Sequence, residues 1–333
     1  MSQPAALVRL FRLPSVLTVP GDVLLGAAWG GEREEPGTVA ALALGSSLLY
    51  LGGMALNDWA DRELDARERP WRPLPSGEVA PAVALGSAVA LTGSGLAVAG
   101  AAGGARRLLA VLPLATTVWL YDLMAKDTPA GPWTMALARA LDVLVGAGRN
   151  GDSRRRRVSP GFGRNGDRSG RHWLLSHPRI GQRRRRVSPG FGRCPLQAVP
   201  SATVVGTHAL LLTLVSAREV DGADRALASR ALLGVVGTTM LAATLIVSGR
   251  RGSNVAFALA CLTLYGWAMG RAGVAALRQP DPVRLQRLVG TGVLANMPLQ
   301  AALLAGRGRR VPAVSLMLTW PAARWAARRT AVT

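Results

Sequence analysis

Apolar runs of nearly the length needed to cross a lipid bilayer recur along this chain of 333 residues. A helix crosses the hydrocarbon core with about 20 predominantly apolar residues. Nine runs approach this length, at about 14–30, 38–56, 80–102, 107–125, 130–148, 195–217, 229–248, 253–271 and 286–306. Together with a hydrophobic share of 49%, they predict an all-α, polytopic membrane protein with a bundle of about nine transmembrane helices.

The two ends of this apolar pattern need separate interpretations. The first run lacks a small-residue cleavage site and is followed by further runs, so we interpret it as a transmembrane helix rather than a removable signal peptide. The shorter apolar stretch 311–329 contains Pro321 and ends in paired Arg residues. We expect this C-terminal amphipathic segment to lie in the membrane interface or to cap the bundle.

The segment 149–193 differs in composition from the rest of the chain. It holds 14 of the 40 basic residues and 2 of the 19 acidic ones, and it repeats RRRRVSPGFGR at 154–164 and 183–193. Its composition predicts disorder, because so few aliphatic residues cannot bury a core. We interpret it as a duplicated or mistranslated insertion; the alternative is an arm for nucleic acid or anionic lipid. The chain thus divides into helices one to five at 1–148, the insertion, and helices six to nine at 194–333.

The distribution of Lys and Arg predicts the orientation of the helices. Without the insertion and the tail, the N-terminus and the loops after the even-numbered runs hold fourteen of these residues, and the opposite loops hold eight. Because positively charged loops stay on the cytoplasmic side, we place the N-terminus and the acidic loops in the cytoplasm. Arg outnumbers Lys 39 to 1, a bias typical of GC-rich bacterial genomes, so we expect the inner (plasma) membrane of a bacterium. We expect no nucleic-acid partner, because the basic excess is concentrated in 149–193 and the other Arg residues are of the ordinary membrane-flanking kind.

The polar sequence NDWADRELDARERPWRPLPSG at 57–77 directly follows the second apolar run. On a helix, Asp58, Asp61 and Asp65 occupy i, i+3 and i+7, and Asn57 lies one turn before Asp61, so all four can face one point. A carboxylate within a membrane costs about 2.5–3.5 kcal/mol unless it has a partner. Asp and Asn oxygens are hard ligands that suit Mg²⁺. The sequence therefore predicts that these four side chains hold Mg²⁺.

Cationic side chains beside this cluster indicate what the metal would bind. Arg67, Arg69 and Arg72 follow the aspartates in a turn set by proline. Guanidinium groups bind phosphate oxygens, and Mg²⁺ commonly bridges protein carboxylates to substrate phosphates. The two together predict a diphosphate site, with Asn57 and Arg69 as substrate-binding residues. The alternative is a solvated loop with scattered ion pairs.

The pattern N-D-x-x-D-x-x-x-D followed by RPLPSG resembles the first signature of the UbiA superfamily of intramembrane prenyltransferases. YDLMAK at 121–126 extends the resemblance. Two later stretches, KDTPAGPWTMALARALDVLVGA and THALLLTLVSAREVDG, look most like the EboC-type bacterial branch of that superfamily. The resemblance implies an all-helical bundle around a central cavity, in which Mg²⁺ binds an isoprenoid diphosphate.

The resemblance also implies roles for single residues. Tyr121 and Lys126 match a Tyr/Lys pair that faces the diphosphate, and Arg72 matches a phosphate contact, so these three are the expected catalytic residues. The superfamily's second aspartate motif should follow the sixth run, where this chain reads SAREVDGADRALASR in place of D-x-x-x-D. Despite this departure, we expect Asp221 and Asp224 to be further Mg²⁺ ligands.

Three polar residues inside later runs admit two interpretations. Arg139 and Asp142 lie three residues apart in the fifth run. We expect them to line the cavity and bind substrate, or to form an ion pair within their helix. His208, also in an apolar run, is predicted to be a hydrogen-bonded packing residue rather than a base.

These features together predict Mg²⁺-dependent transfer of a prenyl group from a prenyl diphosphate to a small, aromatic or cyclic acceptor. The altered second motif leaves open a degenerate relative that only binds or transports isoprenoid lipid. A further alternative is a CDP-alcohol phosphotransferase. DGADRALASR begins like the D-G-x-x-A-R motif of that family, but it has no Ala-Arg at the required offset.

Overall fold

The computed structural model describes residues 9–30, 34–147, 195–217, 225–249 and 254–330, and all regular elements among them are helices. The insertion at 149–193, as well as Asp221 and Asp224, lies outside these described residues. The elements are α2 Leu13–Val16, α3 Val19–Trp29, α4 Pro36–Ala60, α5 Arg62–Glu68, α6 Pro81–Leu120, η1 Tyr121–Ala125, α7 Gly131–Gly146, η2 Pro195–Ala198, α8 Val199–Ser216, α9 Arg225–Ser248, α10 Val255–Arg278, α11 Pro282–Gly306 and α12 Arg310–Thr330.

Proline begins most of the long helices. It lies in the first turn of α3, α4, α6, α7, α8 and α11. No intrahelical hydrogen bond is lost there, and the fixed φ of proline suits the first turn. α11 is also capped by Asp281, which accepts a hydrogen bond of 2.8 Å from the Arg284 amide. This hydrogen bond lowers the pKa of Asp281, since it favours the charged form.

α6 consists of two helical legs joined at Gly104. The φ of Gly104 is 69°, a conformation that favours glycine because it has no Cβ. The legs lie side by side, since the Trp119 indole nitrogen donates to Thr92 Oγ1 at 3.2 Å. The two apolar runs at 80–102 and 107–125 correspond to these two legs.

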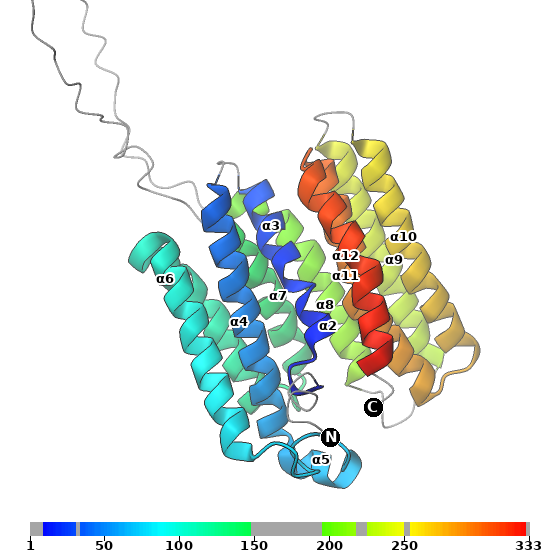
Figure 1. The fold of residues 1–333 in the computed structure, drawn as a ribbon. Helices are drawn as coiled ribbons and strands as arrows, with labels where there is room; N and C mark the ends of the chain where they lie inside the picture. The colour runs from blue at the N-terminus through cyan, green and yellow to red at the C-terminus, as the bar shows by residue number, and fades with distance from the viewer. Residues whose placement is uncertain (1–8, 31–33, 148–194, 218–224, 250–253, 331–333) are drawn as a thin grey trace, which may run out of the picture.

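The helices stand roughly side by side in one bundle, with α5 at one end (Figure 1). α4 packs along α6, and α3 packs along α7. The contact between α3 and α7 depends on two glycines. A Cβ on Gly26 would lie 1.8 Å from the Val143 carbonyl oxygen, and a Cβ on Gly146 would lie 2.0 Å from that of Val23. The two helices can approach so closely only because both positions lack a side chain.

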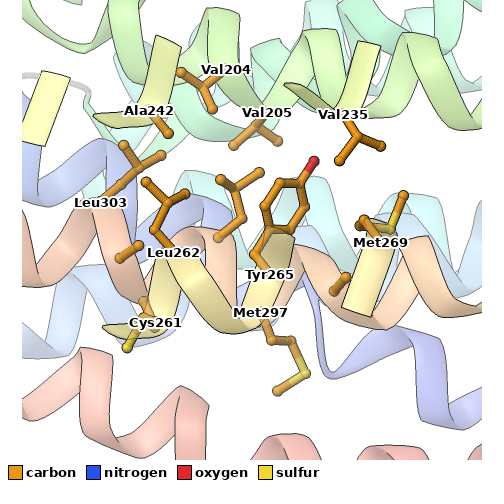
Figure 2. Packing of buried hydrophobic residues seen from close by; sticks show 14 of the residues in the cluster. Val204, Val205, Val235, Ala242, Cys261, Leu262, Tyr265, Met269, Met297 and Leu303 are labelled. Atoms are coloured by element: carbon orange, nitrogen blue, oxygen red, sulfur yellow. The ribbon is translucent and has the colours of Figure 1, made fainter. Parts of the chain in front are cut away.

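The largest apolar core lies among α8, α9, α10, α11 and α12. Figure 2 shows its centre, where labelled side chains from α8, α9, α10 and α11 lie around the buried ring of Tyr265. The labelled residues are Val204, Val205, Val235, Ala242, Cys261, Leu262, Tyr265, Met269, Met297 and Leu303. These helices therefore form a tightly packed apolar half of the bundle.

α12 runs along the bundle beside α11 and does not cap an end (Figure 1). Its buried residues follow a helical stripe at Ala313, Leu316, Trp320 and Ala323, with exposed fractions of 7% or less. The expectation that 311–329 caps the bundle is therefore wrong. The apolar stripe explains this arrangement, because it allows the segment to pack along the bundle as a further helix.

Six helical segments of the described residues are long and apolar enough to cross a membrane. They are Pro36–Ala60, Pro81–Ala125, Leu196–Ser216, Arg225–Ser248, Val255–Arg278 and Pro282–Gly306. Leu13–Trp29 is a shorter apolar segment. The described part of the chain is thus all-helical, and its six candidate spans agree with the predicted multi-pass membrane protein, whereas the predicted count of about nine transmembrane helices stays a prediction.

Candidate functional site

The acidic sequence lies where α4 passes into α5. Asp61 separates the two helices, yet the hydrogen bonds remain helical: its amide donates to the Asn57 carbonyl at 2.9 Å, and the Asp65 amide donates to the Asp61 carbonyl at 2.8 Å. Asp58 and Asp65 are both buried. The helical spacing inferred from the sequence thus extends through Asp65. We call this region, residues 57–65, the acidic end of the bundle.

Each aspartate of the acidic end contacts a cation. Arg12 Nη2 lies 3.0 Å from Asp58 Oδ1. Arg72 Nη1 lies 2.6 Å from Asp65 Oδ2 and 3.7 Å from Asp58 Oδ1, so one guanidinium joins two carboxylates. Arg69 Nη1 lies 3.5 Å from Asp65 Oδ1. The fold therefore gathers Arg69 and Arg72 around the aspartates.

A π-helical turn brings the expected Tyr/Lys pair to the same place. In η1 the Lys126 amide donates to the Tyr121 carbonyl at 2.9 Å, one residue further along than in an α-helix. The Lys126 ammonium then forms an ion pair with Asp61. From the same turn, the Asp122 carboxylate accepts a hydrogen bond of 3.2 Å from Asn57 Nδ2.

Arg12 is a site residue that the sequence reasoning missed. Its φ of 45° is the only positive value at a residue other than glycine in the described part of the chain. Such a conformation costs of order 1–3 kcal/mol and is often found at functional sites. Here it precedes α2 and directs the guanidinium to Asp58 and, at 3.5 Å, to Asn57 Oδ1. In the sequence, Arg12 looks like an ordinary basic residue flanking a membrane span.

Arg12 and Tyr121 also line a cavity of about 250 Å³ that extends from the acidic end into the bundle. Its walls come mainly from α4, α7, α8 and α11 and are largely apolar. A second, smaller cavity of about 70 Å³ adjoins it and shares Tyr50, Tyr121 and Arg139. The arrangement is a charged opening on an apolar chamber, which suits a ligand with an anionic group and an apolar chain.

Arg139 lines both cavities, and Asp142 lines the smaller one. Arg139 does not pair within its own helix. Its Nη2 lies 2.7 Å from Asp22 Oδ2 on α3, while Asp142 accepts a hydrogen bond from Ser46 on α4. The direct ion-pair partner of Arg139 is therefore Asp22, across a helix contact, although Asp142 lies close enough to interact with its charge.

His208 is a packing residue, as predicted. It is buried, its Nε2 donates to the Gly292 carbonyl at 3.0 Å, and its Nδ1 accepts from the Tyr265 hydroxyl at 3.1 Å. Both ring nitrogens are therefore occupied. Arg67, in contrast, is exposed on α5.

Among the described residues, no three His, Cys, Asp or Glu side chains lie close enough to hold one metal ion together. The carboxylates of the acidic end turn toward Arg and Lys groups instead. Their donor chemistry nevertheless fits a hard cation, since it consists of oxygens from Asn57, Asp58, Asp61 and Asp65 on one helical path.

The fold and the site define a class: a multi-pass helical membrane protein with an Asn/Asp cluster at the mouth of an intramembrane cavity. Residues 19–148, which include that cluster, match the model of the UbiA prenyltransferase family. Over these residues the chain is similar to that family.

Curated relatives of this chain are named as prenyl-transferring enzymes. A digeranylgeranylglyceryl phosphate synthase of Natronomonas pharaonis is 35% identical over 91 residues, which are 27% of this chain and 33% of the relative. A protoheme IX farnesyltransferase of Anaeromyxobacter dehalogenans is 32% identical over 152 residues, which are 43% of this chain and 51% of the relative. The chain thus spans between a third and a half of these relatives in the matched segments.

Two solved UbiA homologues have the same fold. The ligand-free structure from Aeropyrum pernix K1 matches with a TM-score of 0.55 at 16% identity and covers 87% of this chain and 96% of that one. A homologue from Archaeoglobus fulgidus, bound to DMAPP and Mg²⁺, matches with a TM-score of 0.51 at 15% identity and covers 87% of this chain and 98% of that one.

Proposed function

We propose that this protein is a membrane prenyltransferase that moves an isoprenoid group from a prenyl diphosphate to a small acceptor. The observation that carries the proposal is the cluster of Arg12, Arg72 and Lys126 around the aspartates at the mouth of an apolar cavity. The family relation and the names of the relatives support it. We place the acidic end on the cytoplasmic side of the inner membrane, as the Lys and Arg count favours.

We further propose that Asn57, Asp58, Asp61 and Asp65, together with Asp221 and Asp224, bind Mg²⁺. A bound Mg²⁺ supplies positive charge that offsets the charge of the diphosphate. The segment with Asp221 and Asp224 begins directly after α8, whose Ser216 lines the same cavity as Arg12. That position supports a second acidic contribution at the same end.

The chain's own residues account for most steps of the transfer. Arg12, Arg72 and Lys126 would exchange carboxylate contacts for diphosphate oxygens and so stabilise the leaving group. The apolar walls would exclude water from the allylic carbon while its bond to oxygen breaks. The acceptor then forms the new bond to that carbon and loses a proton, and pyrophosphate leaves.

Purified protein in lipid nanodiscs, given labelled geranylgeranyl diphosphate, candidate acceptors and Mg²⁺, is expected to release pyrophosphate and form a prenylated product. EDTA should stop both. Binding of the diphosphate without release under any acceptor would indicate a lipid-binding relative instead, and full turnover in EDTA would contradict the role of the metal.

Lys126→Met is expected to raise the KM for the prenyl diphosphate about tenfold, since one charge-assisted contact is worth roughly 1.5–3 kcal/mol. Steady-state kinetics at saturating acceptor measure this value. Lys126→Arg, which keeps the charge, serves as the control and should retain most of the affinity. An unchanged KM in the Met variant would show that Lys126 only pairs with Asp61.

Asp221→Ala is expected to reduce turnover less than Asp61→Ala does. The second acidic segment departs from the family spacing, so it contributes a less complete ligand set. Parallel kinetics of the two variants at several Mg²⁺ concentrations provide the comparison. Equal losses in both variants would show that the altered segment is a full partner in metal binding.

A further inference from the structure

Arginines with almost no acidic counterpart gather at one end of α9, α10, α11 and α12. Residues 225–330 contain 14 arginines and a single acidic residue, Asp281. α9 and α11 begin, and α10 and α12 end, at the end of the bundle where α5 lies (Figure 1). Six exposed arginines lie there within two turns of the helix ends, namely Arg225, Arg230, Arg278, Arg287, Arg328 and Arg329. We call this surface the arginine end.

The arginine end lacks carboxylate partners among the described residues. Asp281 pairs with Arg284, which is half-buried in the first turn of α11, and none of the six exposed arginines forms an ion pair. The sequence 218–224 before α9 adds one arginine and three acidic residues, so arginine stays in excess. The positive charge of this surface must therefore be balanced by a partner or by ions from outside the chain.

The acidic end of the bundle differs, because its cations have partners within the chain. Arg12 pairs with Asp58, and Arg72 pairs with Asp65. The six arginines of the arginine end make no such pairs, and none of them lines either of the two cavities. The arginine end is therefore a surface distinct from the candidate site.

Tryptophan rings beside the arginine end indicate the depth at which it lies in a membrane. Three arginines place their guanidinium groups over the ring of a tryptophan four residues earlier: Arg271 over Trp267 at 5.7 Å, Arg324 over Trp320 at 4.7 Å and Arg329 over Trp325 at 4.2 Å. Trp267 and Trp325 are more than half exposed. Tryptophan prefers the boundary between lipid tails and headgroups, so these guanidinium groups lie at headgroup level.

A guanidinium group that lies over a ring can still bind phosphate. Its five N–H donors lie in the plane of the group and point outward, whereas the ring contacts one face of that plane. The planar fork of donors matches two phosphate oxygens at once. Basic clusters at the ends of membrane helices attract anionic lipid, and each arginine typically strengthens this attraction about fivefold.

We propose that the arginine end binds the phosphate groups of anionic phospholipids such as phosphatidylglycerol. The surface fits lipid better than nucleic acid, because its arginines lie beside exposed tryptophan rings at the ends of helices that are apolar enough to span a membrane. The inference goes beyond the proposed prenyl transfer and does not depend on it, since these arginines belong neither to the cavities nor to the acidic end.

Quenching of Trp325 fluorescence by brominated lipid tests the inference locally, without interference from the basic segment 149–193. The full chain is placed in phosphatidylcholine nanodiscs with an equal, low fraction of dibrominated phosphatidylglycerol or dibrominated phosphatidylcholine. The Trp325 signal is the difference between each protein and its Trp325→Phe counterpart. The parent should favour phosphatidylglycerol at least about tenfold, and Arg328→Gln/Arg329→Gln should lower this preference at least about fivefold. High salt should lower it as well.

Arg62→Gln/Arg67→Gln on α5 is the matched control. Arg62 also lies over a ring, that of Trp59 at 4.7 Å, but it pairs with Glu63. This variant loses the same number of charges and should keep the parent preference at Trp325. Arg328→Lys/Arg329→Lys, which keeps the charge, should retain most of it. If the α12 variant does not fold, Arg271→Gln/Arg278→Gln is measured in the same way at Trp267.

Three results would overturn the inference: equal quenching of the parent by the two lipids, a parent-like preference in the Arg→Gln variants of α12 and α10, or an equal loss in the α5 control. An oligonucleotide that binds the parent but not Arg328→Gln/Arg329→Gln would assign the surface to nucleic acid and also overturn it. Pyrophosphate release is measured separately, so a failure of the proposed function leaves the lipid result unchanged.

Discussion

Asp58→Asn and Asp61→Asn are each expected to lower prenyl transfer at least 100-fold while the protein remains folded in the membrane. Both substitutions keep the shape of the side chain and remove one ligand charge. A 100-fold loss corresponds to about 2.7 kcal/mol of transition-state stabilisation. The lost charge acts on the diphosphate and its metal, so the affinity for the acceptor should change little and excess Mg²⁺ should restore activity only in part.

The measurement is kcat/KM for each substrate, together with size-exclusion profiles to establish that the variants fold. Glu63→Gln is the matched control, since it also removes one carboxylate charge close to Asp61. The Glu63 side chain is 78% exposed and pairs with Arg62, away from the cavity. If both Asn variants react at the parent rate, the aspartates of the acidic end form ion pairs only and have no role in binding the diphosphate or its metal.

Arg139→Leu is expected to destabilise the folded protein by about 3–5 kcal/mol. Arg139 is the ion-pair partner of Asp22, whose side chain has no exposed surface. Its removal leaves a buried carboxylate without the compensating charge, whereas loss of an exposed cation would be screened by water. The thermal midpoint in detergent, measured by loss of monodisperse protein, should fall sharply.

A second substitution distinguishes a charge effect from a packing effect. Adding Asp22→Leu to Arg139→Leu removes the unpaired carboxylate, so much of the lost stability should return. Arg271→Leu is the control for simple loss of a cation, because Arg271 is exposed and lies over the Trp267 ring at 5.7 Å. If Arg139→Leu is as stable as the parent, the buried ion pair does not stabilise the bundle.

Several properties of this protein could be predicted from local sequence. Apolar runs of spanning length predict helices wherever they occur, because lipid offers no other partner for the backbone. The helical spacing of Asp58, Asp61 and Asp65 needs only 3.6 residues per turn, and it survives the break between α4 and α5. The sequence analysis divided 80–125 into two apolar runs, and the helix is interrupted between them at Gly104.

The sequence could not predict which charged side chains form ion pairs with one another. Arg12 lies 46 residues from Asp58, and Asp22 lies 117 residues from Arg139. Proximity in the chain suggested Asp142 as the partner of Arg139, yet the close contact of α3 and α7 at Gly26 and Gly146 brought Asp22 nearer. Such pairings depend on how helices pack, and no local pattern contains that information.

The sequence by itself determined the helices, the membrane class and the acidic motif, since periodicity and hydropathy act over a few turns. Only the tertiary structure decided that Arg12 joins the site and that Lys126 pairs with Asp61. The physical reason is that buried polar groups select partners by distance in space. Those distances exist only once α4, α7, α8 and α11 have packed around the cavity.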